Sequence, residues 1–180
     1  MSAAIPLPAQ RLEAAASRLD RVVELAGRFG AWTGFALIVV MGTNVLMRYL
    51  FRTGSVALQE LEWHLMAPVS LLCIAFAIKH EGHIRVDILY ARFSPFWKAV
   101  VELVSAMLAL LLSLLIVWLS VPYVYQSFSI GEGSPDPGGL PYRFIVKSMI
   151  PLGFVLLALQ STAWLMRASI PLLVPRDRQA

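Results

Sequence analysis

The stretch LVSAMLALLLSLLIVWLSV, residues 103–121, is the clearest structural signal in the chain. It contains no charged residue, and about 20 apolar residues are what a helix needs to cross the hydrocarbon core of a bilayer. Extended back to Phe96, it predicts a transmembrane helix over 96–121. Three other apolar blocks predict further spans over about 29–50, 58–78 and 144–166. We therefore expect an all-α membrane protein with four transmembrane helices.

The composition of the 180 residues agrees with this fold class. Hydrophobic residues make up 58% of the chain and charged residues 14%, whereas about 45–50% and 25% are usual in soluble domains. The net charge of +4 is spread along the chain, which does not favour a nucleic-acid partner. Cys73 is the only cysteine, so the sequence excludes an intrachain disulfide and a thiolate-rich metal site.

The distribution of Lys and Arg predicts the orientation. Eleven of these residues lie near the ends of the spans that face one side, and four lie near the other ends. Cytoplasmic connections carry the excess of positive charge. Both termini are therefore expected in the cytoplasm, with residues 1–28 and 167–180 as cytoplasmic segments on either side of a transmembrane domain over 29–166.

Residues 14–28 have a mixed pattern that differs from the spans. Arginines occupy helix positions between the apolar ones, which recur at helical spacing: Leu12, Ala15, Leu19, Val22, Val23 and Ala26 against Arg11, Arg18, Arg21 and Arg28. This pattern predicts an amphipathic helix lying on the inner leaflet. The alternative is a solvent-exposed extension of the first span.

Polar residues at the outer ends of the first two spans suggest a contact between them. Asn44, Arg48 and Arg52 follow one stripe of the first helix, and Glu60 and His64 are four residues apart on the second. A short turn joins the two helices, so we expect Arg48 or Arg52 to pair with Glu60. We interpret this set as a structural contact; the alternative is an ion or substrate site.

The histidines and carboxylates do not form a pattern typical of catalysis. His80 and His83 are three residues apart, which differs from the H-E-x-x-H arrangement of zinc enzymes. His64 lies near the opposite end of its span and cannot share a haem iron with them. The sequence has no paired catalytic carboxylates, no nucleophile beside a base and no phosphate loop. We expect neither an enzyme nor a bound metal or other cofactor.

Two longer stretches resemble a known family, the DctQ small membrane subunits of TRAP (tripartite ATP-independent periplasmic) transporters. Residues 44–89 contain "RYLF" at the end of the first span, Glu60 near the start of the second, and "GHIRVDIL" after it. Residues 134–160, "SPDPGGLPYRFIVKSMIPLGFVLLALQ", are similar to the family's outer loop and fourth span. The resemblance covers about residues 29–166 in all.

The resemblance implies a function. In such systems a periplasmic binding protein delivers an organic acid to a membrane complex, whose large subunit carries the sodium and substrate sites. The small subunit is similar to a fixed scaffold. This chain would then support sodium symport of a carboxylate in the bacterial inner membrane, without a substrate site of its own. Its partners would be the large permease subunit, the solute-binding protein and membrane lipid. The alternatives are a stand-alone four-helix transporter or channel, or an accessory subunit of another complex.

Two sets of residues are then expected at contacts. The structural or interface set is Asn44, Arg48, Arg52, Glu60, His64, His83, Arg85 and Asp87. The outer loop over 127–142 is rich in Gly and Pro, which favour a fixed irregular surface. Its two charged residues, Glu132 and Asp136, are expected to contact the binding protein.

Overall fold

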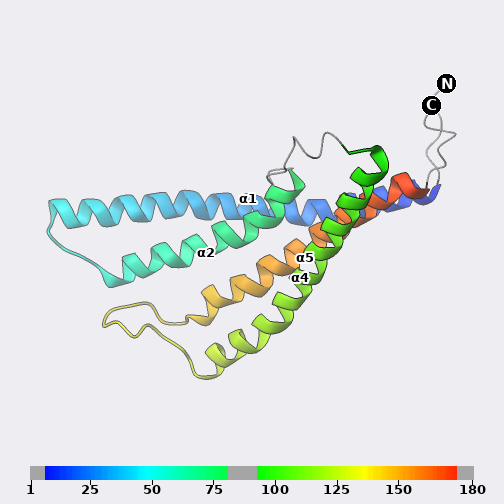
Figure 1. The fold of residues 1–180 in the computed structure, drawn as a ribbon. Helices are drawn as coiled ribbons and strands as arrows, with labels where there is room; N and C mark the ends of the chain where they lie inside the picture. The colour runs from blue at the N-terminus through cyan, green and yellow to red at the C-terminus, as the bar shows by residue number, and fades with distance from the viewer. Residues whose placement is uncertain (1–6, 81–92, 174–180) are drawn as a thin grey trace.

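The computed structural model describes residues 7–80 and 93–173, which form four helices (Figure 1). They are α1 (Leu7–Leu50), α2 (Val56–Lys79), α4 (Pro95–Ser129) and α5 (Phe144–Leu173). No strand occurs in these two ranges. All four helices are long and apolar enough to cross a membrane. The predicted fold class is therefore confirmed, while the orientation with both termini in the cytoplasm stays a prediction.

The helices form two pairs that meet on α5. α1 packs against α2, α4 packs against α5, and α5 also contacts both α1 and α2. Figure 1 shows α1, α4 and α5 close together toward the end that holds the termini, with α2 ending short of it, and the helices spread apart at the opposite end. We call these the terminal end and the loop end. The loop end carries the connections 51–55 and 130–143, and α1 extends there beyond its neighbours.

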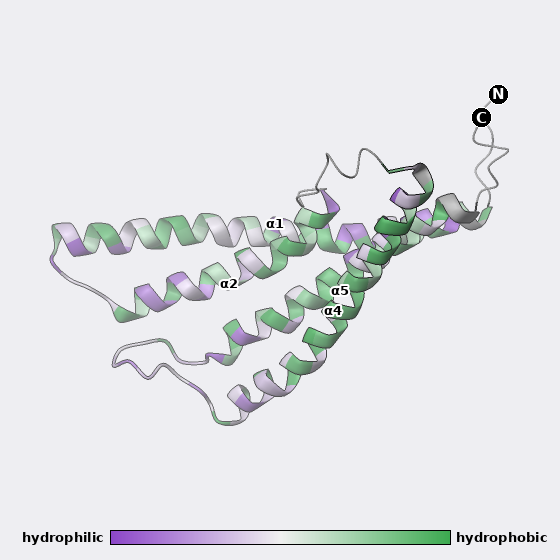
Figure 2. Ribbon diagram, in the orientation of Figure 1, coloured by the Kyte–Doolittle hydropathy of each residue, from purple (hydrophilic) through white to green (hydrophobic). Residues whose placement is uncertain are grey.

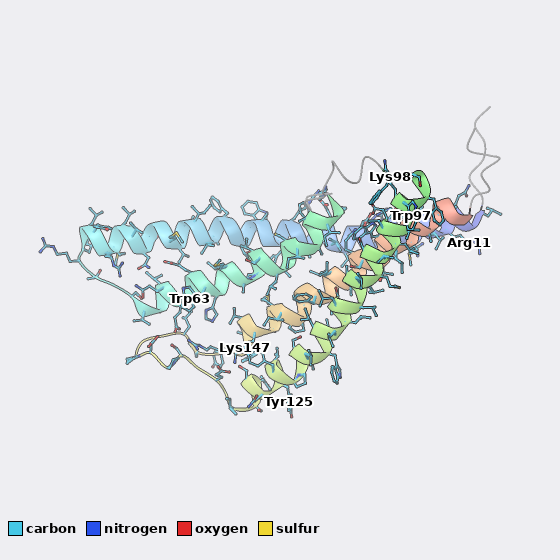
Figure 3. The ribbon with its side chains drawn as sticks, in the orientation of Figure 1. Arg11, Trp63, Trp97, Lys98, Tyr125 and Lys147 are labelled. Carbon is cyan, nitrogen blue, oxygen red and sulfur yellow. The ribbon has the colours of Figure 1, made fainter. Side chains whose placement is uncertain are left out.

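Polar and aromatic side chains mark both ends of the bundle. Figure 2 shows hydrophobic residues along most of α4 and α5, with hydrophilic ones concentrated toward the connections. In Figure 3, Arg11, Trp97 and Lys98 lie toward the terminal end, and Trp63 and Lys147 lie toward the loop end. Tryptophan and long cationic side chains are typical of the two membrane–water interfaces. This arrangement agrees with helices that cross a bilayer from end to end.

The helix starts and the internal prolines follow local rules. The Ser55 hydroxyl accepts a hydrogen bond from the Leu58 N–H over 3.3 Å and so caps α2. Pro95 occupies the first turn of α4, where a missing N–H costs nothing. Pro68 and Pro122 lie inside α2 and α4. Membrane helices tolerate such prolines because neighbouring groups satisfy the freed carbonyls.

Small residues at seven-residue intervals form the packed faces. Every seventh residue is buried on α1 from Ala9 to Gly30 and on α4 from Ala106 to Ser127. A seven-residue repeat keeps one face on a neighbouring helix when the two cross at a small left-handed angle. Alanine, serine and glycine at these positions let the backbones approach closely. The positions are Ala9, Ala16, Val23 and Gly30 on α1, and Ala106, Ser113, Ser120 and Ser127 on α4.

The apolar core lies where α1, α2 and α5 meet. Val23, Leu72, Ala75 and Leu156 form one buried cluster, one or two residues from each helix. The crossing of α2 and α5 is close at Gly153, where an added Cβ would lie 2.8 Å from the Leu71 carbonyl oxygen. Backbone atoms cannot move aside as a side chain can, so this crossing depends on glycine.

The predicted segment 14–28 is helical, but it is the same helix as the first span. α1 runs without a break from Leu7 to Leu50. Ala16 and Val23 are buried in the bundle, so part of the apolar stripe packs on neighbouring helices. The unbroken helix agrees with the alternative of an extended first span. That the exposed faces of residues 14–28 lie on the inner leaflet stays a prediction.

Candidate functional site

Polar residues of the loop end gather around the connection between α4 and α5. α4 ends in a double hydrogen bond, with the Gly131 N–H donating to the Phe128 carbonyl and the Glu132 N–H to the Ser127 carbonyl, over 3.1 and 3.0 Å. Gly131 has a φ of +58°, a left-handed conformation that suits glycine. This is the Schellman arrangement of a helix end. The chain therefore leaves α4 in a fixed direction.

Glu60 joins this connection to α2. The residue is only 9% exposed. Its carboxylate accepts hydrogen bonds from the Ser134 hydroxyl, from the Leu140 N–H over 2.6 Å and from the Arg143 guanidinium over 3.2 Å. Charge-assisted hydrogen bonds of this kind are among the stronger ones in proteins. Three donors from one loop thus converge on one carboxylate and hold residues 134–143 against the start of α2.

Gly139 is required where the loop passes Glu60. An added Cβ there would lie 2.7 Å from Glu60 Oε2 and closer still to Ser134 Oγ. The loop also bonds to itself, since the Ser134 N–H donates to the Leu140 carbonyl over 3.1 Å and the Gly139 N–H to the Asp136 carbonyl over 3.0 Å. The segment is therefore a folded element in its own right and not a loose connection.

A second ion pair anchors the loop to α4 and α5. Lys147 of α5 donates a hydrogen bond to Glu132, and its Nζ lies 4.3 Å from the centroid of the Tyr123 ring on α4. The bond from Lys147 lowers the pKa of the Glu132 carboxyl. The Arg143 N–H donates to the Glu132 carbonyl over 2.9 Å. We call this group the loop cluster: Glu60, Glu132, Ser134, Gly139, Arg143 and Lys147.

The partner expected for Glu60 was wrong. Glu60 forms its ion pair with Arg143, which is 83 residues away in sequence. Arg48 and Arg52 are exposed and form no ion pair with a residue that the structure describes. Arg48 lies in the last turn of α1 and Arg52 in the connection that follows. α1 extends beyond its neighbours at this end, so the short turn does not bring either arginine to the Glu60 carboxylate.

Asn44 and His64 do make contacts at this end. The Asn44 amide donates a hydrogen bond to Glu62 over 2.8 Å and so joins α1 to α2. His64 Nδ1 lies 2.7 Å from the Glu60 carbonyl oxygen of its own helix. Its Nε2 is buried without a partner among the described residues. Asn44 is thus an interhelical contact, whereas the polar contact of His64 lies within α2.

A network of ion pairs lies at the terminal end. Glu24 of α1 accepts from Arg28 of the same helix over 3.2 Å, from Lys79 at the end of α2 over 2.6 Å, and lies 3.1 Å from His80 Nε2. The His80 ring also packs on Phe76, with 4.3 Å between the ring centroids. These contacts tie the end of α2 to the middle of α1.

Arg167 ties α5 to the start of α1. Its guanidinium bonds to Asp20 over 2.6 Å and to Glu13 over 3.1 Å. Together with the Glu24 network, it explains why α1 follows the bundle from Leu7 to Glu24 instead of leaving it. We call this second group the terminal cluster: Glu13, Asp20, Glu24, Arg28, Lys79, His80 and Arg167.

The structure does not test every residue that was predicted at a contact. His83, Arg85 and Asp87 lie outside the described residues. Of the two charges expected to meet a binding protein, Glu132 is paired with Lys147, and Asp136 is exposed on the loop. Within 7–80 and 93–173 no three His, Cys, Asp or Glu side chains gather as a metal site would require.

Sequence reasoning missed Arg143, Lys147 and the terminal cluster. No local signal pairs Glu60 with Arg143, because one lies in α2 and the other in the 130–143 loop, 83 residues away. The seven-residue spacing of Ala9, Ala16, Val23 and Gly30 is a signal that could have extended α1 toward the N-terminus.

Comparisons with known proteins agree with the architecture. Residues 37–169 match the family described as the DctQ component of tripartite ATP-independent periplasmic transporters. A relative from Haemophilus influenzae, which carries the provisional name of a TRAP transporter small permease protein, is 25% identical over 122 residues. The match covers 66% of this chain and 74% of the relative. The family match includes all of α2 and α4, most of α5, residues 37–50 of α1 and the whole loop cluster. The chain therefore belongs to the DctQ component family of tripartite ATP-independent periplasmic transporters.

Proposed function

We propose that this chain is the fixed scaffold subunit of a sodium-coupled TRAP transporter for a carboxylate solute. Its family and its four apolar helices make it a multi-pass protein of the bacterial inner membrane. The proposal adds that a large permease subunit carries the sodium and substrate sites. A periplasmic solute-binding protein would deliver the solute, and this chain would move none by itself.

The observation that supports a scaffold most directly is the anchoring of the 130–143 loop. The loop is bonded to α2 through Glu60, and to α4 and α5 through Glu132, Lys147 and Tyr123. A transport gate would need an element with two arrangements. A loop bonded to three helices instead offers one fixed surface, which suits a docking platform.

The unpartnered faces of α1 and α4 support a large partner within the membrane. Side chains such as Ile38, Tyr49, Leu111 and Trp118 are exposed on the isolated chain, with values from 56 to 78%. Lipid can cover such faces, and so can the helices of another subunit. The scaffold proposal assigns part of this surface to the large permease subunit.

Reconstitution in liposomes tests which subunits are needed for transport. The purified chain alone in liposomes should show no sodium-driven uptake of a carboxylate. Uptake should require the large subunit and the binding protein together. Sodium-driven uptake by this chain without partners would refute the scaffold role and favour the stand-alone transporter.

The exposed Asp136 is proposed as the docking charge of the loop. Asp136→Lys should weaken uptake that depends on the binding protein at low ionic strength, where attraction between surface charges is strongest. The control is Glu62→Gln at the same end of the molecule, which changes charge outside the loop. Unchanged uptake with Asp136→Lys would remove the docking role and leave the scaffold role standing.

The proposed orientation is tested at two exposed positions. A cysteine at Asp136 should react with an impermeant thiol reagent added from the periplasmic side, and a cysteine at Ser94 should not. Both residues are exposed in the fold, so a difference in labelling reports the side of the membrane. The natural Cys73 lies at the crossing of α1 and α2 and is replaced by Ala in both variants.

A further inference from the structure

A cavity of about 480 Å³ opens beside α1 at the terminal end of the bundle. One face of α1 and the end of α2 line it. The side chains that matter for its chemistry are Asp20, Arg21, Glu24, Leu25, Arg28 and Lys79. The cavity thus combines cationic and anionic groups around one apolar residue, a composition that suits an amphipathic, phosphate-containing molecule.

Two arginines in this cavity are available to an anion. Lys79 is held by Glu24 over 2.6 Å. Arg28 uses its Nε for Glu24, and its side chain is 71% exposed. Arg21 is exposed and forms no ion pair with any described residue. Arg21 and Arg28 are two helical turns apart on the same face, with Leu25 between them. A phosphate above Leu25 could therefore accept hydrogen bonds from both guanidinium groups.

The depth of the cavity relative to the membrane matches a lipid head group. No charged residue lies between Arg28 and Arg48. At 1.5 Å per residue this uncharged part of α1 is about 30 Å long, the thickness of the hydrocarbon core. Arg28 therefore lies at the edge of the core. The cavity is lined by residues of α1 that come before Arg28, so it lies at the level of the lipid phosphates.

An apolar stripe leads from the cavity toward the hydrocarbon. Leu25 lines the cavity and is 69% exposed, and Phe29 and Trp32 follow it on the same helix face with 61 and 71% exposed. Acyl chains could lie along these three side chains while the head group occupies the cavity. A soluble phosphate compound would make no use of this stripe, so a lipid is the occupant that fits the whole feature.

Asp20 adds a requirement for the head group. Its Oδ2 accepts from Arg167 over 2.6 Å, but its Oδ1 is buried without a partner among the described residues. A buried carboxylate oxygen without a hydrogen bond is costly. The ammonium group of phosphatidylethanolamine or a glycerol hydroxyl of phosphatidylglycerol could donate to it. The trimethylated ammonium of phosphatidylcholine has no N–H and could not.

We infer that this cavity binds one membrane phospholipid, whose phosphate lies between Arg21 and Arg28 and whose head group donates a hydrogen bond to Asp20. The site is separate from the loop cluster and does not depend on the transport function proposed above. It would fix the long N-terminal part of α1 at the membrane surface, beside the contacts that Arg167 and Lys79 already make.

Lipid binding to the full chain, in the complex with which it purifies, tests the inference. After mild delipidation, phosphatidylethanolamine, phosphatidylglycerol or phosphatidylcholine is added back and counted by native mass spectrometry. The first two should bind more tightly than phosphatidylcholine. Arg21→Gln should weaken their binding on the order of tenfold, which corresponds to one lost charge-assisted hydrogen bond.

Arg18→Gln is the matched control. Arg18 is exposed on the same helix one turn away and does not line the cavity. The inference is overturned if Arg18→Gln weakens binding as much as Arg21→Gln, since that would reflect general attraction to a basic surface. Equal binding of phosphatidylcholine would overturn it as well. Displacement of the lipid by millimolar inorganic phosphate would show a site for free anions instead. Because Arg21 is exposed, both variants should keep the thermal stability of the natural chain.

Discussion

The two halves of α1 differ in sequence and in surroundings: the half before residue 31 carries seven charged residues, and the half after it carries only Arg48. In the half that begins at Leu7, every seventh residue from Ala9 to Gly30 is buried, and ion pairs reach it from α2 and α5. In the half from 31 to 50, no residue is buried, and Asn44 makes the side-chain hydrogen bond to α2. The chain's own helices therefore fix the first half, whereas the second half needs lipid or another protein beside it.

The largest expected difference between the halves comes from a pair of glycines. A Cβ added at Gly27 would lie 2.7 Å from Phe76 Cβ, and one at Gly42 would have no neighbour within 4 Å. Gly27→Ala should lower the free energy of unfolding by about 1–3 kcal/mol, as overpacking does. Gly42→Ala should not lower it, and alanine's higher helix propensity should raise it by up to about 1 kcal/mol. Denaturation in mixed detergent micelles measures both, and equal effects would contradict the contrast.

Two arginines give the next contrast. Arg167→Ala removes the contacts to Glu13 and Asp20, and should cost about 1–2 kcal/mol because the side chain is partly exposed. Hydrogen exchange should rise in α1 before Val23. Arg48→Ala at the far tip of α1 should change neither quantity. Unchanged exchange in the Arg167 variant would mean that apolar packing alone holds the start of the helix.

The hydrogen bond between Asn44 and Glu62 should have a smaller effect. Asn44→Leu should cost about 0.6 kcal/mol, a typical value for polar contacts between membrane helices. Spin labels at Leu50 and Gln59 should show a broader distance distribution between the tips of α1 and α2. Thr43→Val is the control, since the Thr43 hydroxyl bonds only within α1, to the Val39 carbonyl. A broader distribution in the control would assign the effect to α1 itself.

Acid should loosen the loop end slightly. The pKa of Glu132 is lowered by its bond from Lys147, so the folded loop favours the ionised carboxyl. This contribution is complete above the ordinary carboxyl pKa of about 4.3 and is lost as the pH falls below it. Exchange in residues 130–143 should increase as the pH falls from about 5 to about 3. Glu132→Gln should exchange faster at pH 6 and respond less to acid; an identical response would assign the effect to another carboxyl.

The features that were predictable from the sequence are those that depend on composition over many residues. The four spans followed from long, largely apolar blocks, of which 103–121 is uncharged, and the structure places a helix over each. The start of α1 was harder because Arg11, Arg18 and Arg21 suggested a surface helix. Small residues beneath them pack on α5 and α2, and small residues give little hydrophobic signal.

Partner choice at the loop cluster could not be predicted. Glu60 was singled out from the sequence, but the nearest basic residues in sequence, Arg48 and Arg52, are not its partners. The loop reaches Glu60 because Gly131 turns the chain at the end of α4 and Gly139 leaves room beside the carboxylate. Both effects depend on the backbone geometry of segments about 80 residues apart, which cannot be derived from the pattern of a single sequence.

Because α1 is one uninterrupted helix of 44 residues, it also acts as a lever. It is about 66 Å long, and its sequence has no proline after the first turn to let it bend. If α1 pivots near Gly30, a change of about 5° in its tilt would move Leu50 by roughly 3 Å. Bilayer thickness sets helix tilt, so the tip should be displaced relative to the anchored 130–143 loop when the membrane becomes thinner. Spin-label distances from Leu50 to Asp136 in bilayers of different chain length would measure this displacement, and a constant distance would show that the pair moves as one body.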